Sequence, residues 1–230
     1  MATATWTDIG IVKDGGAAVG AITLAAFSPD GVLYAASQLE NSIYTVDTNT
    51  AAATLLGVVK EPDGTRVNVS GADIAFGADG TLHIWINNPK AGRSASAPRG
   101  LYTLDLPASG GAVTARFLGA GGTGYPITGM AIADGGLGDL VASKREKVPG
   151  PGGEVFQGEI LVLDKTAGAT VGVYEMFLDG AAYIYQFGDM TIAHKHVIVC
   201  HKGRNTISVG LGAATQHMAK HGDTLGPCGP

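Results

Sequence analysis

Histidine is the residue type with the most chemical promise in this chain, because five of the six histidines follow position 193. His217 and His221 are four positions apart, which places them on one face if that segment is helical. His194 and His196 fall in a predicted turn. Imidazoles at such spacing suit zinc, copper or nickel, so these four histidines form a candidate metal site, with zinc as the expected ion. The alternative is that they are surface histidines of a turn and a loose tail.

Two aspartates form a second candidate site. Asp73 and Asp189 occupy equivalent positions in two related segments of the chain and would face each other across a ring-shaped fold. Their carboxylates would hold a hard cation such as calcium in the central channel. The matching positions of the other two segments are Leu24 and Gly129. The alternative is therefore that each aspartate accepts hydrogen bonds from nearby backbone N–H groups and holds the ring together. The sequence requires no cofactor.

The elements that must position these residues are predicted from a sequence motif that occurs four times. Each copy has two apolar runs around turn-forming residues, the pattern of a β-hairpin. A third alternating segment follows each hairpin, and a fourth follows three of them. The four phrases are ITLAAFSPDGVLYAAS (22–37), GADIAFGADGTLHIW (71–85), ITGMAIADGGLGDLVAS (127–143) and FGDMTIAHKHVIVCHK (187–202).

Four-stranded antiparallel units that repeat about every 50 to 60 residues are typical of a β-propeller. The last unit lacks an outer strand, so Thr5–Val12 is predicted to pair with Thr206–Val209 and close the ring. The fold expected is an all-β, four-bladed propeller in one domain over 1–211, with a tail over 212–230. The alternative, a two-sheet sandwich, leaves the repeats unexplained. The expected blades are about 22–59, 70–119, 127–178, and 186–210 completed by 2–12.

The phrase at 71–85 resembles blades of the NHL and gluconolactonase-like propeller families, and the resemblance covers the four hairpins. Four blades is the count of hemopexin-like folds, whose own motifs are absent here. The resemblance implies a propeller fold and, for gluconolactonase-like enzymes, a metal ion held at the channel mouth by Glu, Asn and Asp side chains. Such an ion activates water or polarises a carbonyl. Asp73 and Asp189 supply two carboxylates where that site needs more ligands.

A propeller also predicts a basic face. Two long loops, 87–99 and 144–157, fall on the same side of the ring, and 11 of the 15 Lys and Arg residues map to that side. Long loops on a rigid scaffold are where binding usually occurs. The alternative is that these charges only solvate the loops. The residues predicted to bind an acidic glycan or a protein are Lys90, Arg93, Arg99, Lys144, Arg145, Lys147, Lys202 and Arg204, with Phe156, Tyr183 and Tyr185 beside them.

Composition narrows the function classes. The chain has 230 residues, 36 glycines and a net charge of −5, which favours a soluble all-β domain over a general nucleic-acid binder. No apolar run approaches the roughly 20 residues that span a bilayer, so we expect no membrane insertion. Cys200 and Cys228 are expected at opposite ends of the fold and therefore unpaired with each other.

Three functions remain open from the sequence. The first is a non-enzymatic propeller that binds an anionic partner through its basic face. The second is a structural subunit of a larger assembly such as a virion, appendage or surface layer, where head-to-tail self-association is also conceivable because the two faces differ in charge. The third is a metal-dependent, lactonase-like hydrolase. No GxSxG motif and no nucleophile with a nearby base occurs.

Overall fold

The structure is a computed structural model, in which the chain separates into two compact units. The N-terminal unit contains 1–132 and 139–190, and the C-terminal unit contains 133–138 and 191–230. In the part of the chain that is described, no helix is long and apolar enough to cross a membrane. The residues that the structure describes are 7–69, 71, 73–87, 98–107, 110–121, 127–132, 140–150, 153–175, 177–178, 181–182, 196–210, 217–218, 220–225 and 228.

The first repeat forms an antiparallel meander, as its sequence predicts. Its strands are β3 (Ile22–Phe27), β4 (Leu33–Ser37), β5 (Ser42–Val46) and β6 (Ala52–Lys60), each paired with the next. The turn between β3 and β4 is made locally: Ser28 Oγ accepts the Val32 N–H at 3.1 Å, and Gly31 adopts a φ of +85°. A positive φ is the conformation that glycine tolerates best.

The second repeat forms a matching meander, which joins the first through its outer strand. Its strands are β7 (Asp73–Phe76), β8 (Leu82–Ile86), β9 (Gly100–Asp105) and β10 (Gly111–Gly119). β10 pairs in parallel with β6, with Gly111 opposite Gly57. A Cβ on Gly57 would lie 1.9 Å from the Gly111 carbonyl oxygen, so this seam has no room for a side chain.

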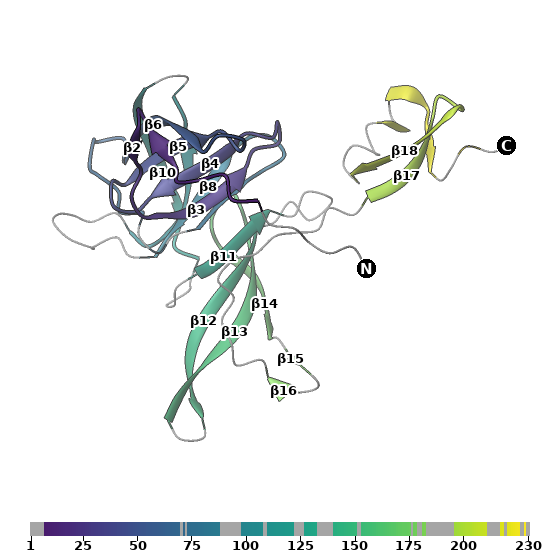
Figure 1. The fold of residues 1–230 in the computed structure, drawn as a ribbon. Helices are drawn as coiled ribbons and strands as arrows, with labels where there is room; N and C mark the ends of the chain where they lie inside the picture. The colour runs from purple at the N-terminus through teal and green to yellow at the C-terminus, as the bar shows by residue number, and fades with distance from the viewer. Residues whose placement is uncertain are drawn as a thin grey trace. The chain divides into compact units, whose positions relative to one another are not determined.

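The seam produces one sheet with the order β3-β4-β5-β6-β10-β9-β8-β7. Its two end strands, β3 and β7, lie against each other, so the sheet is nearly closed (Figure 1). Apolar side chains from both meanders fill its interior. They include Ile43, Val59, Ile84, Tyr102 and Val113, each fully buried.

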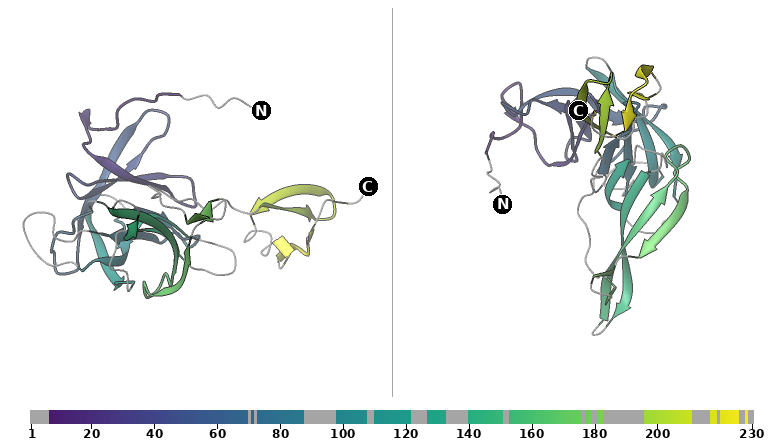
Figure 2. Two further views of the ribbon diagram at one scale, coloured as in Figure 1. Left: turned by 90° about the horizontal axis from the view of Figure 1, so that it is seen from below. Right: turned by 90° about the vertical axis from the view of Figure 1, so that its right-hand side faces the viewer.

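The third repeat forms a separate four-stranded sheet of β11 (Ile127–Ile132), β12 (Leu140–Gly150), β13 (Gly153–Leu163) and β14 (Thr170–Glu175). The prediction of an irregular loop at 144–157 is wrong. β12 and β13 pair without interruption from Leu140 and Leu163 to Gly150 and Gly153, and Figure 2 shows them as two long paired ribbons. Charged residues, Pro and Gly suggested a loop, but cross-strand pairing overrides such local preferences. A short hairpin of β15 (Phe177–Leu178) and β16 (Ala181–Ala182) follows.

The predicted ring closure by the N-terminus is not confirmed. Residues 7–12 form no strand, and the residues before them lie outside the described part. β1 (Lys13–Asp14) pairs with β2 (Ala17–Ala18) and, in parallel, with β6. β1 occupies the start of β6 and β10 its end, so one strand serves two partners. The count of four blades stays a prediction.

The C-terminal unit contains the second and third strands predicted for the fourth repeat. β17 (His196–His201) pairs with β18 (Asn205–Gly210) along its whole length. Its other edge pairs with β19 (Thr224–Leu225), a strand from the segment that was predicted to be a tail. The inner strand expected near 186–193 lies outside the described residues.

The expectation that Cys200 and Cys228 are unpaired is wrong. They form a disulfide with Cα atoms 4.7 Å apart. The Cys228 N–H donates to Oγ1 of Thr206, the residue opposite Cys200 in the β17–β18 pairing, so Cys228 lies beside Cys200. The sequence interpretation had instead placed the two cysteines at opposite ends of the fold.

Candidate metal centre in the C-terminal unit

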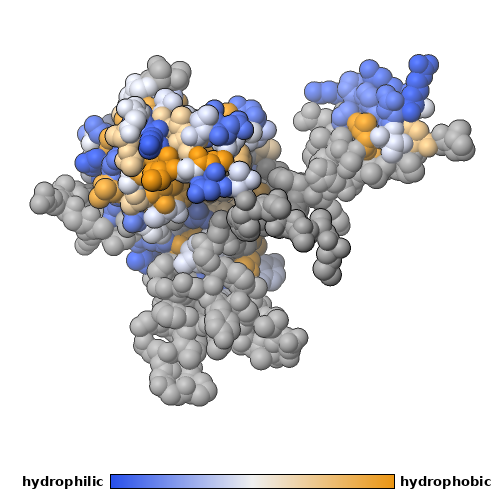
Figure 3. Space-filling model, in the orientation of Figure 1, coloured by the Kyte–Doolittle hydropathy of each residue, from blue (hydrophilic) through white to orange (hydrophobic). Residues whose placement is uncertain are grey.

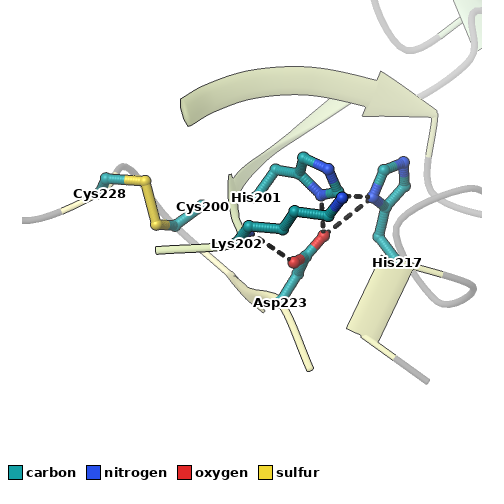
Figure 4. A network of polar contacts seen from close by, with 6 residues as sticks. All are labelled: Cys200, His201, Lys202, His217, Asp223 and Cys228. Atoms are coloured by element: carbon teal, nitrogen blue, oxygen red, sulfur yellow. Dashed lines mark hydrogen bonds and ion pairs between the residues drawn. A yellow bond between two sulfur atoms is a disulfide. The ribbon is translucent and has the colours of Figure 1, made fainter. Parts of the chain in front are cut away.

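Three segments of the C-terminal unit bring histidine and aspartate side chains together (Figure 4). His201 is the last residue of β17. His217 lies in a short helical turn, which includes 217–218 and 220–221. Asp223 directly precedes β19, and the pairing of Thr224 with Cys200 places it beside His201. Gly222, with a φ of +65°, donates its N–H to the Met218 carbonyl and ends the turn, which is how glycine commonly stops a helix.

The donor atoms of these three residues converge. Asp223 Oδ2 lies 2.6 Å from His201 Nδ1 and 2.9 Å from His217 Nδ1. The two Nδ1 atoms are 3.3 Å apart. Histidine nitrogens and a carboxylate oxygen that lie within 4.8 Å of one another can ligate a single ion.

The carboxylate of Asp223 is fully buried, and both of its oxygens have partners. Oδ2 faces the two imidazoles, and Oδ1 accepts the Lys202 backbone N–H at 2.9 Å. Burial by itself raises the pKa of Asp223, but the hydrogen bonds from His201, the Lys202 N–H and His217 outweigh it and hold that pKa well below its ordinary value. Asp223 is therefore a carboxylate at neutral pH, and it is fixed in place.

His221 completes a ring of three imidazoles. Its ring centroid lies 5.4 Å from that of His201 and 5.5 Å from that of His217, and the His201 and His217 centroids are 5.0 Å apart. His221 is exposed, whereas His201 and His217 are half-buried. Its nitrogens are not in the group of three converging donor atoms.

The structure brings together only two of the four histidines predicted to form a metal site. The structure brings His217 and His221 together, as their spacing of four suggested. His196 begins β17 at the end opposite His201, about 16 Å away at the rise of a strand, and His194 lies outside the described residues. Sequence reasoning missed His201 and Asp223 as donors. Their one local signal is the His221-Gly222-Asp223 step, in which a helix-ending glycine separates two ligand types.

Asp73 has a structural role in the described residues. Its Oδ1 accepts the Ile74 N–H at 2.9 Å, and its Oδ2 accepts the Met130 N–H, which ties β7 to β11. Asn87 makes a similar link, because its Oδ1 accepts the Ile127 N–H at 2.9 Å. This is the backbone-bonding role that the sequence left open as an alternative. Asp189 lies outside the described residues, so a cation held by both aspartates stays a prediction.

The residues predicted to form one basic face have different surroundings. Lys144 Nζ donates to Glu159 at 2.8 Å in a largely buried ion pair, and Arg99 Nε donates to the Asn87 carbonyl at 2.8 Å. Lys202 and Arg204 are exposed in the C-terminal unit, whose visible described surface is mostly hydrophilic (Figure 3). Arg145, Lys147 and Phe156 lie on β12 and β13 instead of in a loop. Lys90, Arg93, Tyr183 and Tyr185 lie outside the described residues. A partner-binding face stays a prediction.

Three aspartates between strands have a local role in their turns. Asp47, Asp79 and Asp164 each accept backbone N–H groups two or three residues further along the chain, at 2.7 to 3.3 Å. The Thr166 hydroxyl also donates to Asp164 at 2.6 Å. These hydrogen bonds lower the pKa of each carboxyl group below its ordinary value, with the Thr166 hydroxyl the leading cause at Asp164. The three aspartates therefore stabilise their turns.

Comparison with known proteins finds solved structures of low similarity. No family model and no curated protein matches this chain. A PQQ-bound aldose sugar dehydrogenase from Streptomyces coelicolor matches with 18% identity and a TM-score of 0.37, over 64% of this chain and 45% of that one. A putative gluconolactonase matches with 11% identity and a TM-score of 0.37, over 82% of this chain and 70% of that one. The chain thus spans less than half the length of the dehydrogenase, and neither match bears on the chemistry of the histidine and aspartate cluster.

Proposed function

We propose that this protein binds a divalent transition-metal ion, zinc first among them, through His201 Nδ1, His217 Nδ1 and Asp223 Oδ2. The observation that carries the proposal is the convergence of these three atoms. In a tetrahedral site with bonds of 2.0 to 2.1 Å, any two donor atoms are about 3.3 Å apart. The two Nδ1 atoms have that separation, and each nitrogen needs to move only about 0.4 to 0.7 Å from the carboxylate oxygen to reach it.

Electrostatics supports a cation at this point. Three atoms that carry lone pairs face one another, and the two N–H groups that bond Asp223 Oδ2 are crowded, because their nitrogens are only 3.3 Å apart. A divalent ion would accept all three lone pairs at once. It would also compensate the buried charge of Asp223, which is costly to leave without a positive partner.

Binding would add a further link among three segments of the C-terminal unit. The ion would bridge the end of β17, the helical turn of His217 and the residue before β19. Metal binding in such a small unit contributes directly to its folding free energy. The proposed role is therefore metal binding that stabilises the C-terminal unit. The alternative of a hydrolase with a metal at the channel mouth has no comparable group of converging metal ligands among the described residues.

The test is a metal titration of the full chain after removal of bound metal by a chelator. We expect one zinc equivalent per chain by elemental analysis, and a zinc affinity at least about 100-fold lower in His201→Ala, His217→Ala and Asp223→Asn, because even outer-shell substitutions cost 10- to 100-fold. Lys220→Ala is the matched control, since Lys220 is an exposed residue of the same turn without a donor role in the cluster.

The fold of each variant is checked independently of metal by detecting the Cys200–Cys228 peptide in a non-reducing digest. A wild-type protein without a zinc equivalent would refute the proposal. So would variants that keep the disulfide and bind zinc as tightly as Lys220→Ala.

A further inference from the structure

We infer that His221 is the fourth ligand of this ion, so that the completed centre has three imidazoles and one carboxylate. The inference rests on the proposed metal-binding function and specifies its coordination. Three protein donors leave one position of a tetrahedral ion to be filled. His221 is the described residue whose ring stands next to both His201 and His217.

The spacing of the three rings carries the inference. For imidazoles on one tetrahedral zinc, bonds of 2.0 to 2.1 Å place ring centroids about 5.2 Å apart. The observed centroid separations are 5.0, 5.4 and 5.5 Å, close to an equilateral triangle of that size. His221 therefore already occupies the place of a third imidazole, and its nitrogen has only to turn toward the other donors.

The local backbone allows that turn. The side chain of His221 is exposed, so its ring can rotate without disturbing a packed core. Gly222 follows it, and a Cβ at Gly222 would meet nothing within 4 Å. Asp223, in contrast, is buried, and its Oδ1 accepts the Lys202 backbone N–H, a bond that metal binding at Oδ2 leaves intact. The site thus combines a rigid carboxylate with a ligand that can swing into place once the ion is bound.

A fourth protein ligand would change what the ion does. Structural zinc sites have four protein ligands, whereas catalytic sites keep one position for water or substrate. With His221 bound, the ion has no open coordination position. The role of the ion is then to link the C-terminal segment to β17. The centre is then a closed structural site and not a hydrolytic one.

The experiment compares wild type, His221→Ala and Lys220→Ala as full chains, using zinc for affinity and X-ray absorption at the zinc edge to count imidazole ligands. We expect three imidazoles in wild type and in Lys220→Ala, and two in His221→Ala. We also expect a 10- to 100-fold lower zinc affinity in His221→Ala. Free imidazole added to His221→Ala should enter the vacated position and restore much of the affinity and the third imidazole signal.

Two results separate this inference from the metal site itself. Two imidazoles in wild type, together with unchanged zinc affinity in His221→Ala, would refute the role of His221 and leave a three-ligand centre. Absence of zinc binding in wild type would refute the site as a whole. Loss of affinity in His221→Ala without rescue by imidazole would show that the residue supports the helical turn and is not a ligand.

Discussion

Breaking the Cys200–Cys228 disulfide should destabilise the C-terminal unit and weaken its hold on zinc. The bond joins residues separated by 28 positions, and all four candidate ligands, His201, His217, His221 and Asp223, lie within that loop. The disulfide therefore restricts, in the unfolded chain, the same segment that the ion must organise. The Cys228 backbone N–H also donates to Thr206 Oγ1 at 3.0 Å, so the disulfide holds the final segment beside β18.

The magnitude follows from loop entropy. A cross-link that closes a loop of this size removes about 12 cal/mol/K from the unfolded ensemble, which is about 3.5 kcal/mol at 25 °C. Among the described residues of the C-terminal unit, the buried apolar side chains are those of Val199 and Cys200, and so few buried side chains contribute little to stability. If the reduced unit must fold in order to bind, the same energy is taken from zinc binding, and affinity falls by up to about 400-fold.

The assay avoids reductants, which themselves bind zinc, by using the double variant Cys200→Ala/Cys228→Ala. Unfolding of the C-terminal unit is followed in chelator, and zinc affinity is then measured by competition with a chromophoric chelator. Removing both sulfurs ensures that no free thiol next to His201 serves as a new ligand. A metal-free unfolding free energy within about 0.5 kcal/mol of wild type, or zinc affinity within twofold, would refute the reasoning.

Three further predictions concern the N-terminal unit, each measured by denaturant unfolding of the full chain. Asp73→Ala should cost about 1 to 3 kcal/mol for each backbone N–H that it leaves unsatisfied, and a loss below about 0.5 kcal/mol would contradict its structural role. Burial lowers the pKa of His83 in the folded state. As the pH drops, the unfolded chain therefore binds this proton first, and the free energy of unfolding should fall below about pH 6.5. His83→Asn should remove this contribution to the pH dependence of stability, and an unchanged pH dependence would exclude His83 as its source. Gly57→Ala should lower the free energy of unfolding by at least about 2 kcal/mol, because its Cβ would meet the Gly111 carbonyl. Gly110→Ala is the control, since the space around its Cβ is open. Equal effects of the two substitutions would refute the tight seam.

The parts of the fold that the sequence predicts are those settled by neighbouring residues. The turns at Gly31 and Gly80 need a positive φ, and Asp79 accepts a hydrogen bond from the N–H two residues further along. The hairpins around these turns can therefore be predicted from the sequence. The pairing of β6 with β1 and β10 involves segments far apart in the chain, and no local pattern specifies it. The extension of β12 and β13 pairs neighbouring segments, but its charged residues, Pro and Gly are typical of a loop and hid it.

The candidate metal site likewise has a part that local sequence predicts and a part that depends on distant pairing. His217 and His221 are readable because helical spacing is local. His201 and Asp223 meet only because β19 pairs with β17, and a strand of two residues is too short to show any periodicity. The disulfide likewise joins residues separated by 28 positions, so no local pattern indicates it.

The seam between β6 and β10 also bears on the order in which the chain folds. Within each meander, every strand pairs with the next one in the sequence, so those contacts close short loops. The seam brings Gly57 against Gly111, and its loop entropy is repaid only when both meanders are already in place. Contact order therefore predicts that the hairpins form before the two meanders join along the β6–β10 seam.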